Sequence, residues 1–159
     1  EEEKLSKVTN SLTLRIFALS GHFIRDPNLF ALGNFLISAK LKKPISINAL
    51  NNVIRSYGFA SDIAKSAIKW LLNTNNSEYD NKKIDVISHT TNLLNLAKEI
   101  TQIYDLPNIK ENINYSLVAD DYTSESNLFL NFLKAHNMES TPMNTQIKET
   151  MKSIFIENL

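Results

Sequence analysis

The chain has 159 residues, of which 43% are hydrophobic and 21% are charged, and this composition is typical of a packed globular protein. The absence of cysteine excludes disulfides, thiolate metal ligands and a cysteine nucleophile, and it fits a cytoplasmic location. The formal net charge is zero, but Lys and Arg outnumber Asp and Glu by thirteen to six between residues 4 and 104. This asymmetry indicates a basic face on an otherwise neutral protein.

No segment has the pattern of a leader or a membrane span. The chain begins with Glu1, Glu2 and Glu3, whereas a signal peptide begins with basic residues. The most apolar window, residues 30–41, is only about 12 residues long, and a spanning helix needs roughly 20. We therefore expect a core helix in this window and no contact with a membrane.

Three glycines and four prolines interrupt the chain, and the long apolar-periodic runs between them predict an all-α fold. Apolar residues recur at steps of three and four in most of these runs, which is the spacing of an amphipathic helix. The only credible strand is the β-branched run within residues 83–88. The predicted helices are residues 4–24, 28–43, 46–57, 61–72, 90–104, 107–118, 124–136 and 141–159.

Residues 46–72 have the pattern of a helix-turn-helix. Ser46 is a candidate N-cap of the first helix, Gly58 is placed where a left-handed residue ends it, and Ser61 caps the second helix. The second helix of such a motif enters the major groove of DNA. Its predicted outward positions are Asp62, Lys65, Ser66 and Lys69.

At this point the order of parts resembles winged-helix regulators of the multiple-antibiotic-resistance (MarR-type) class and of the phenylacetate-repressor type. The resemblance covers about residues 30–94. It rests on Ile45-Ser46 and Leu50 at the opening of the motif, and on residues 80–83 and 86–90, which look like the tip and return strand of a wing.

The resemblance implies a winged helix-turn-helix core at residues 30–90, with packing or dimerisation helices at 1–26 and 91–159, in a single domain of residues 1–159. It implies a homodimeric transcription regulator that binds double-stranded DNA and needs no cofactor. Lys40, Lys42, Lys43 and Arg55 would add only non-specific attraction to phosphates. The implied DNA-binding residues are Ser61, Asp62, Lys65, Ser66, Lys69, Lys82 and Lys83.

A helical protein-interaction module that acts as an adaptor, inhibitor or effector domain is the alternative, because the net charge is zero and the last third is acidic. Catalytic and metal sites are not expected. His22, His89 and His136 lie far apart in the sequence, and the acidic cluster at Asp120 and Asp121 lacks the glycine of a calcium loop. Three dispersed glycines cannot form a phosphate loop. The sequence therefore predicts a protein that is not an enzyme.

Overall fold

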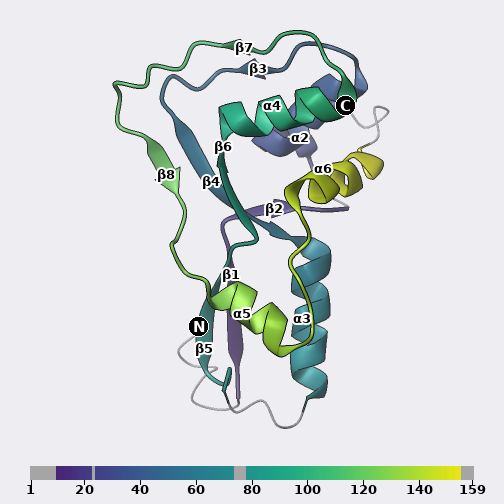
Figure 1. The fold of residues 1–159 in the computed structure, drawn as a ribbon, viewed down its shortest axis with the longest axis vertical. Coiled ribbons are helices and arrows are strands. Elements are labelled where there is room, and N and C mark those ends of the chain that lie inside the picture. The colour runs from purple at the N-terminus through teal and green to yellow at the C-terminus, as the bar shows by residue number, and fades with distance from the viewer. Residues whose placement is uncertain (1–9, 23, 74–77, 155–159) are drawn as a thin grey trace.

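The computed structural model describes residues 10–22, 24–73 and 78–154, and these residues form a mixed α/β fold (Figure 1). The predicted all-α fold is therefore wrong. The elements in chain order are β1 (Leu12–Ile16), β2 (Ala18–Ser20), η1 (Pro27–Leu29), α2 (Ala31–Lys40), β3 (Ser46–Ile47), β4 (Val53–Phe59), α3 (Ala60–Leu72), β5 (Lys82–Val86), β6 (His89–Asn92), α4 (Leu93–Tyr104), β7 (Lys110–Glu111), β8 (Asp120–Tyr122), α5 (Leu128–Ala135) and α6 (Met143–Lys152).

Strand β4 is the centre of a four-stranded sheet. Its last residues pair in parallel with β2, so that Ala18 lies opposite Tyr57, and its first residues pair in parallel with β8. Strand β6 runs antiparallel along the other side of β4. A second sheet consists of β1 and β5, which pair in parallel from Leu12 opposite Lys82 to Ile16 opposite Val86. Strands β3 and β7 form a short parallel pair at the end of the molecule opposite to β1 and β5 (Figure 1).

Two apolar cores hold these elements together. The first lies between α2, α4 and α6 and the adjoining strands, and it includes Leu36, Ile100 and Ile147, all fully buried. The second lies between the β1–β5 sheet and α5, where Ile84 and Phe129 are fully buried. Figure 1 shows the three helices of the first core at one end of the molecule and the β1–β5 sheet with α3 and α5 at the other.

The first predicted helix, residues 4–24, is wrong over its described part, which forms β1 and β2. Leu12, Leu14 and Ile16 alternate with Thr13 and Arg15, and this period of two is that of a strand. The parallel pairing with β5 satisfies the backbone of β1, and Leu12 and Leu14 pack against the second core. Residues 1–9, where this predicted helix begins, lie outside the described residues.

The predicted helix at residues 46–57 is also wrong, because this segment contains β3 and most of β4. Gly58 lies inside β4, and it does not have the left-handed conformation of a helix C′ residue. A β-carbon at Gly58 would lie 2.4 Å from Cγ1 of Val86, so glycine allows β4 to approach β5 closely. Without the first helix there is no helix-turn-helix, and the winged-helix resemblance does not hold.

The predicted wing fails for a related reason. A wing is a hairpin, but β5 pairs with β1 and β6 pairs with β4, so the two strands are not hydrogen-bonded to each other. The predicted helix at 107–118 is replaced by β7 and turns. Helices α2, α3, α4, α5 and α6 and strand β5 confirm the remaining predicted elements, with shifted ends. A single domain of residues 1–159 stays a prediction.

Candidate functional site

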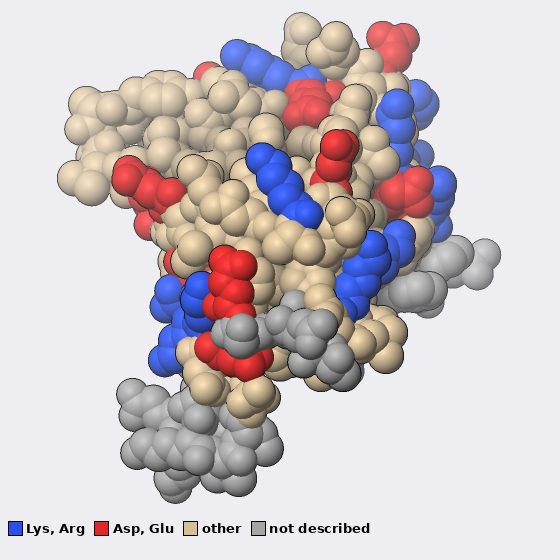
Figure 2. Space-filling model, turned by 60° about the horizontal axis from the view of Figure 1, so that its bottom comes forward, with Lys and Arg blue, Asp and Glu red and all other residues tan. Residues whose placement is uncertain are grey.

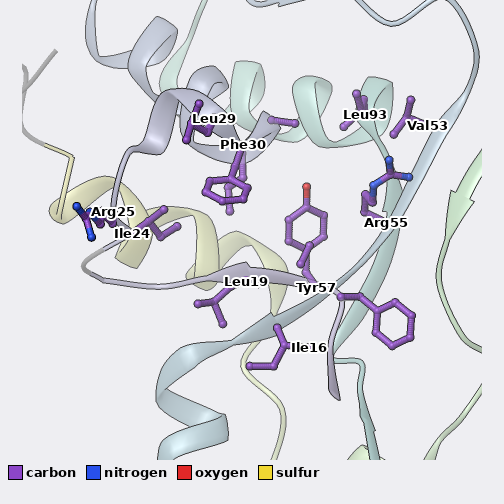
Figure 3. A pocket seen from close by; sticks show the side chains of 14 residues that line it. Ile16, Leu19, Ile24, Arg25, Leu29, Phe30, Val53, Arg55, Tyr57 and Leu93 are labelled. Atoms are coloured by element: carbon purple, nitrogen blue, oxygen red, sulfur yellow. The ribbon is translucent and has the colours of Figure 1, made fainter. Parts of the chain in front are cut away.

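The described residues enclose an open cavity of about 660 Å³ beside the four-stranded sheet. Figure 3 shows the side chains converging on it from β2, β4, and the segment that leads into α2. A cavity of this size accommodates a ligand of several hundred daltons. The lining comprises residues 16–19, residues 24–25, residues 29–32, Val53, Arg55, Tyr57 and Leu93.

Most of the side chains that line the cavity are apolar. Leu19 from β2 and Phe30 from the start of α2 reach into it, and both are more than a third exposed (Figure 3). The only lining side chains with a nitrogen or oxygen atom are Arg25, Arg55 and Tyr57. Apolar walls with a few polar groups are typical of pockets that bind small molecules.

Arg55 is the only cationic side chain on the β4 side of this lining. Its Nη2 donates to Oδ2 of Asp120 at 2.7 Å, and its Nη1 donates to Oδ1 of the same carboxylate at 3.1 Å. Nη1 also donates to the backbone oxygens of Ile54 and Asp120. The hydrogen bond from Arg55 lowers the pKa of the Asp120 carboxyl below its ordinary value. The parallel pairing of β8 with β4 therefore creates an ion pair at the cavity rim.

Tyr57 contributes a buried phenol. Only 3% of this residue is exposed, and its hydroxyl points into the cavity (Figure 3). The hydroxyl makes no hydrogen bond to any residue that the structure describes. Burial raises the pKa of Tyr57 to about 12, with a smaller opposing effect of the Arg55 charge. Tyr57 thus stays protonated at neutral pH and presents an unused hydrogen-bond donor to a ligand.

The residues predicted to contact DNA do not form one exposed surface. Asp62 and Ser66 were predicted to face outward, but both are buried, and Ser61 is half-buried. Lys65 and Lys69 are both exposed, and Lys69 donates to the backbone oxygen of His136. Lys82 and Lys83 lie on β5, at some distance along the chain from α3. None of these residues lines the cavity.

On the face shown in Figure 2, charge is distributed unlike a nucleic-acid interface. The face in Figure 2 shows acidic side chains interspersed among the basic ones. A DNA-binding face instead gathers Lys and Arg in a patch or stripe. Within residues 10–22, 24–73 and 78–154, no group of three or more His, Asp or Glu side chains could hold a metal ion. No helix in the same part of the chain is long and apolar enough to cross a membrane.

Solved structures with the same fold are NAD(P)-binding epimerases and reductases with a Rossmann-like sheet. The UDP-glucuronic acid 4-epimerase of Bacillus cereus, in complex with UDP-glucuronic acid and NAD, is 14% identical, with a TM-score of 0.69 over 95% of this chain. A UDP-N-acetylglucosamine 4-epimerase from Methanobrevibacter ruminantium is 16% identical, with the same TM-score over 99%. The UDP-glucose 4-epimerase of Thermotoga maritima is 17% identical, with a TM-score of 0.64 over 95%.

The chain spans about half the length of these enzymes, 49%, 50% and 48% respectively. No protein-family model and no curated protein matches the sequence. The fold rules out the predicted winged-helix regulator and gives no support to a helical adaptor. The prediction that the chain is no enzyme is contradicted too, because the neighbours that share its fold are enzymes.

Sequence reasoning missed the cavity and the role of Arg55, which was taken for a source of non-specific attraction. One signal was present: Arg55 lies between Ile54 and Tyr57 in a run of β-branched and aromatic residues that leads directly into α3. Its partner Asp120 is 65 residues away in the sequence. Only the pairing of β4 with β8 brings the two together.

Proposed function

We propose that this chain forms the substrate-binding side of an NAD(P)-dependent enzyme of the epimerase or reductase type. The observation that carries the proposal is that nearly the whole chain matches about half of such enzymes, with TM-scores up to 0.69. The cavity with Arg55 and Tyr57 supports it, because it combines apolar side chains with a cation and a hydroxyl donor that has no partner among the described residues. This is the composition expected where an anionic organic substrate binds.

The residues of the chain itself do not fit a dinucleotide. A Rossmann-type site binds the pyrophosphate at a glycine-rich turn before a helix, and the three glycines of this chain are Gly21, Gly33 and Gly58. None of them is close enough in the sequence to another to form such a turn. Under this proposal the cofactor contacts are made by residues outside this sequence, and we derive no chemical step through the cofactor.

Two surfaces support the presence of a further part of the enzyme. Parallel sheets are normally covered on both faces and rarely stop at two strands, but β1 and β5 pair only with each other among the described residues. Helix α3 also exposes Ile68, Leu71 and Leu72 near its end. An exposed apolar helix face and an open sheet edge are each suited to packing against further structure.

Within this proposal the chain's residues bind and orient the substrate. Arg55 attracts an anionic group, and the ion pair with Asp120 holds its guanidinium at a defined place. Tyr57 donates its hydroxyl proton to an acceptor on the substrate. Leu19 and Phe30 cover the substrate and exclude water, which strengthens both polar contacts.

The absence of cysteine makes a direct binding test possible. Leu19→Cys puts a thiol on the cavity wall, and Leu50→Cys puts a matched thiol at an exposed site outside the lining. We expect small organic anions to slow alkylation of Leu19→Cys but not of Leu50→Cys, and we expect NAD to protect neither. The panel includes UDP-glucose, UDP-glucuronic acid and simple carboxylates. Protection by NAD alone, or by no anion, contradicts the proposed substrate-binding side.

A further inference from the structure

We propose that the group bound in this cavity is an apolar monocarboxylate, with an aliphatic or aromatic body and one carboxylate at Arg55. This inference rests on the proposed function, because it takes the cavity as the substrate site. It goes further by assigning a chemical class that differs from the sugar nucleotides of the structural neighbours. Three features carry it: the apolar side chains of the lining, the pairing of Arg55 with Asp120, and the Tyr57 hydroxyl, which has no partner among the described residues.

The lining is poorly suited to a sugar. A sugar presents a hydroxyl on nearly every carbon, and each one loses water when it is buried. Beyond Arg25, Arg55 and Tyr57, the lining offers only carbon side chains. Buried sugar hydroxyls would therefore lack side-chain partners. The same walls favour a hydrocarbon body, for which each buried methylene group tightens binding about fourfold, from about 0.8 kcal/mol per methylene.

The charge at Arg55 matches one negative charge better than several. The Asp120 carboxylate already balances part of the guanidinium charge through two hydrogen bonds. A diphosphate would bring at least two further negative charges next to Asp120, where like charges repel. Arg55 has five N–H donors, and its Nε takes part in none of its hydrogen bonds to described residues. One carboxylate oxygen can therefore be bound without displacing Asp120.

Tyr57 provides the second contact. The residue is 3% exposed, but its hydroxyl faces the open cavity, has no partner among the described residues, and points to the same end of the cavity as Arg55 (Figure 3). A ligand oxygen at this place can therefore accept a hydrogen bond from the hydroxyl without displacing a protein partner. A carboxylate has two oxygens, one for Arg55 and one for Tyr57. Leu19 and Phe30 then lie along the apolar body.

Arg25 lies at the mouth and serves as a matched control. Its side chain is 94% exposed, so its charge is screened by solvent and salt. Both arginines line the cavity, but only Arg55 lies on a strand of the sheet and is paired with a carboxylate of the neighbouring strand. Replacement of Arg25 by Gln therefore tests whether any cationic residue near the cavity is sufficient to bind the carboxylate.

The experiment is calorimetric titration of the purified chain with hexanoate, octanoate and decanoate, with the matched alcohols, and with UDP-glucose. We expect affinity to rise about fourfold per methylene, octanoate to bind at least tenfold tighter than octanol, and UDP-glucose to bind more weakly than octanoate. Arg55→Gln should weaken octanoate about tenfold or more, and Tyr57→Phe about threefold to tenfold. Arg25→Gln should change the affinity less than twofold.

Circular dichroism of each variant shows whether it is folded, and Leu19→Cys in the otherwise unchanged chain reports occupancy where a variant does not fold. If UDP-glucose protects this thiol at lower concentration than octanoate does, the inference is overturned and the proposed function stands. If octanoate and octanol bind equally, the carboxylate contact is wrong. If no anion binds or protects, the inference and the proposed function both fail.

Discussion

Asp62 at the start of α3 accepts two hydrogen bonds from Thr141, one from the backbone nitrogen and one from Oγ1, both at 2.8 Å. Asp62 is 5% exposed, so this contact is inside the protein. Thr141 lies two residues before α6, and Asp62 and Thr141 are 79 positions apart in the sequence. The Asp62 carboxylate therefore connects α3, which follows the central strand β4, to the segment between α5 and α6.

Replacement of Asp62 by Ala should destabilise the fold. The substitution leaves a backbone N–H and a hydroxyl without their acceptor, and the loss of charge-assisted hydrogen bonds of this kind costs roughly 2 to 3 kcal/mol. Urea unfolding followed by circular dichroism measures the change in the free energy of unfolding. The exposed Asp121→Ala is the matched control and should change it by less than about 0.5 kcal/mol. Equal effects of the two substitutions would show that the Thr141 contact does not stabilise the fold.

The helices were predictable because each carries its own pattern. In α4, Leu93, Ala97 and Ile100 repeat at the helical period, and the structure places Ala97 and Ile100 in the first core. The N-cap of this helix is Asn92, whose side chain accepts from the backbone nitrogen of Asn95. This information is local, so a single sequence contains it.

The strands were missed because their stability depends on distant partners. Leu12 to Ile16 pairs with residues 70 positions later in the sequence, and the short run has apolar spacings that a helix also allows. In β4, Tyr57 and Gly58 were interpreted as the end of a helix, because a glycine after an apolar run has that meaning locally. The cavity needs the same long-range pairings. Neither the approach of Ala18 to Tyr57 nor that of Asp120 to Arg55 has a local signature.

Gly58→Ala tests the close approach of β4 to β5. The added methyl group would lie 2.4 Å from Cγ1 of Val86, so either the Val86 side chain must rotate or one of the strands must move. We expect a loss of roughly 1 to 3 kcal/mol, as for overpacking elsewhere in protein cores. Val86→Ala in the same chain removes the obstructing atom, and the double variant should lose less stability than the two single losses combined. Strict additivity in urea unfolding would contradict the steric explanation.

Tyr57 predicts a loss of stability in alkaline solution. Its pKa is raised from 10.0 to about 12 in the folded protein, so folding favours the protonated phenol. The stability that the protonated phenol of Tyr57 contributes is fully present below pH 10 and is lost as pH rises through 12. A shift of two pKa units corresponds to a loss in the free energy of unfolding on the order of 2 to 3 kcal/mol. This loss is measured relative to the Tyr57→Phe variant, which has no phenol to titrate. Unfolding free energies at pH 8, 10 and 11.5 measure the difference, with the exposed Tyr115→Phe as control.

The Arg55–Asp120 pair predicts a shift in the titration of one carboxyl group. The pKa of Asp120 is lowered chiefly by the hydrogen bond from Arg55. Its stabilising contribution is therefore present above the ordinary pKa of 3.8 and is lost as pH falls through the lower value in the folded protein. Arg55→Gln should raise the pKa of Asp120 toward 3.8, which carboxyl-carbon NMR titration measures directly. An unchanged titration would show that the pair does not persist in solution.

The exposed apolar end of α3 predicts self-association of the isolated chain. Ile68, Leu71 and Leu72 are 55%, 70% and 77% exposed, and side chains of this size in one patch favour contact with another surface. Replacing all three by Gln should shift sedimentation at high concentration toward the monomer. It should leave the urea midpoint nearly unchanged, since these side chains are not in either core. Leu29→Gln, at an exposed leucine of the cavity lining, is the control and should not change sedimentation. If the triple variant instead unfolds at lower urea, these residues stabilise the chain itself and are not a surface for the further part of the protein that we propose.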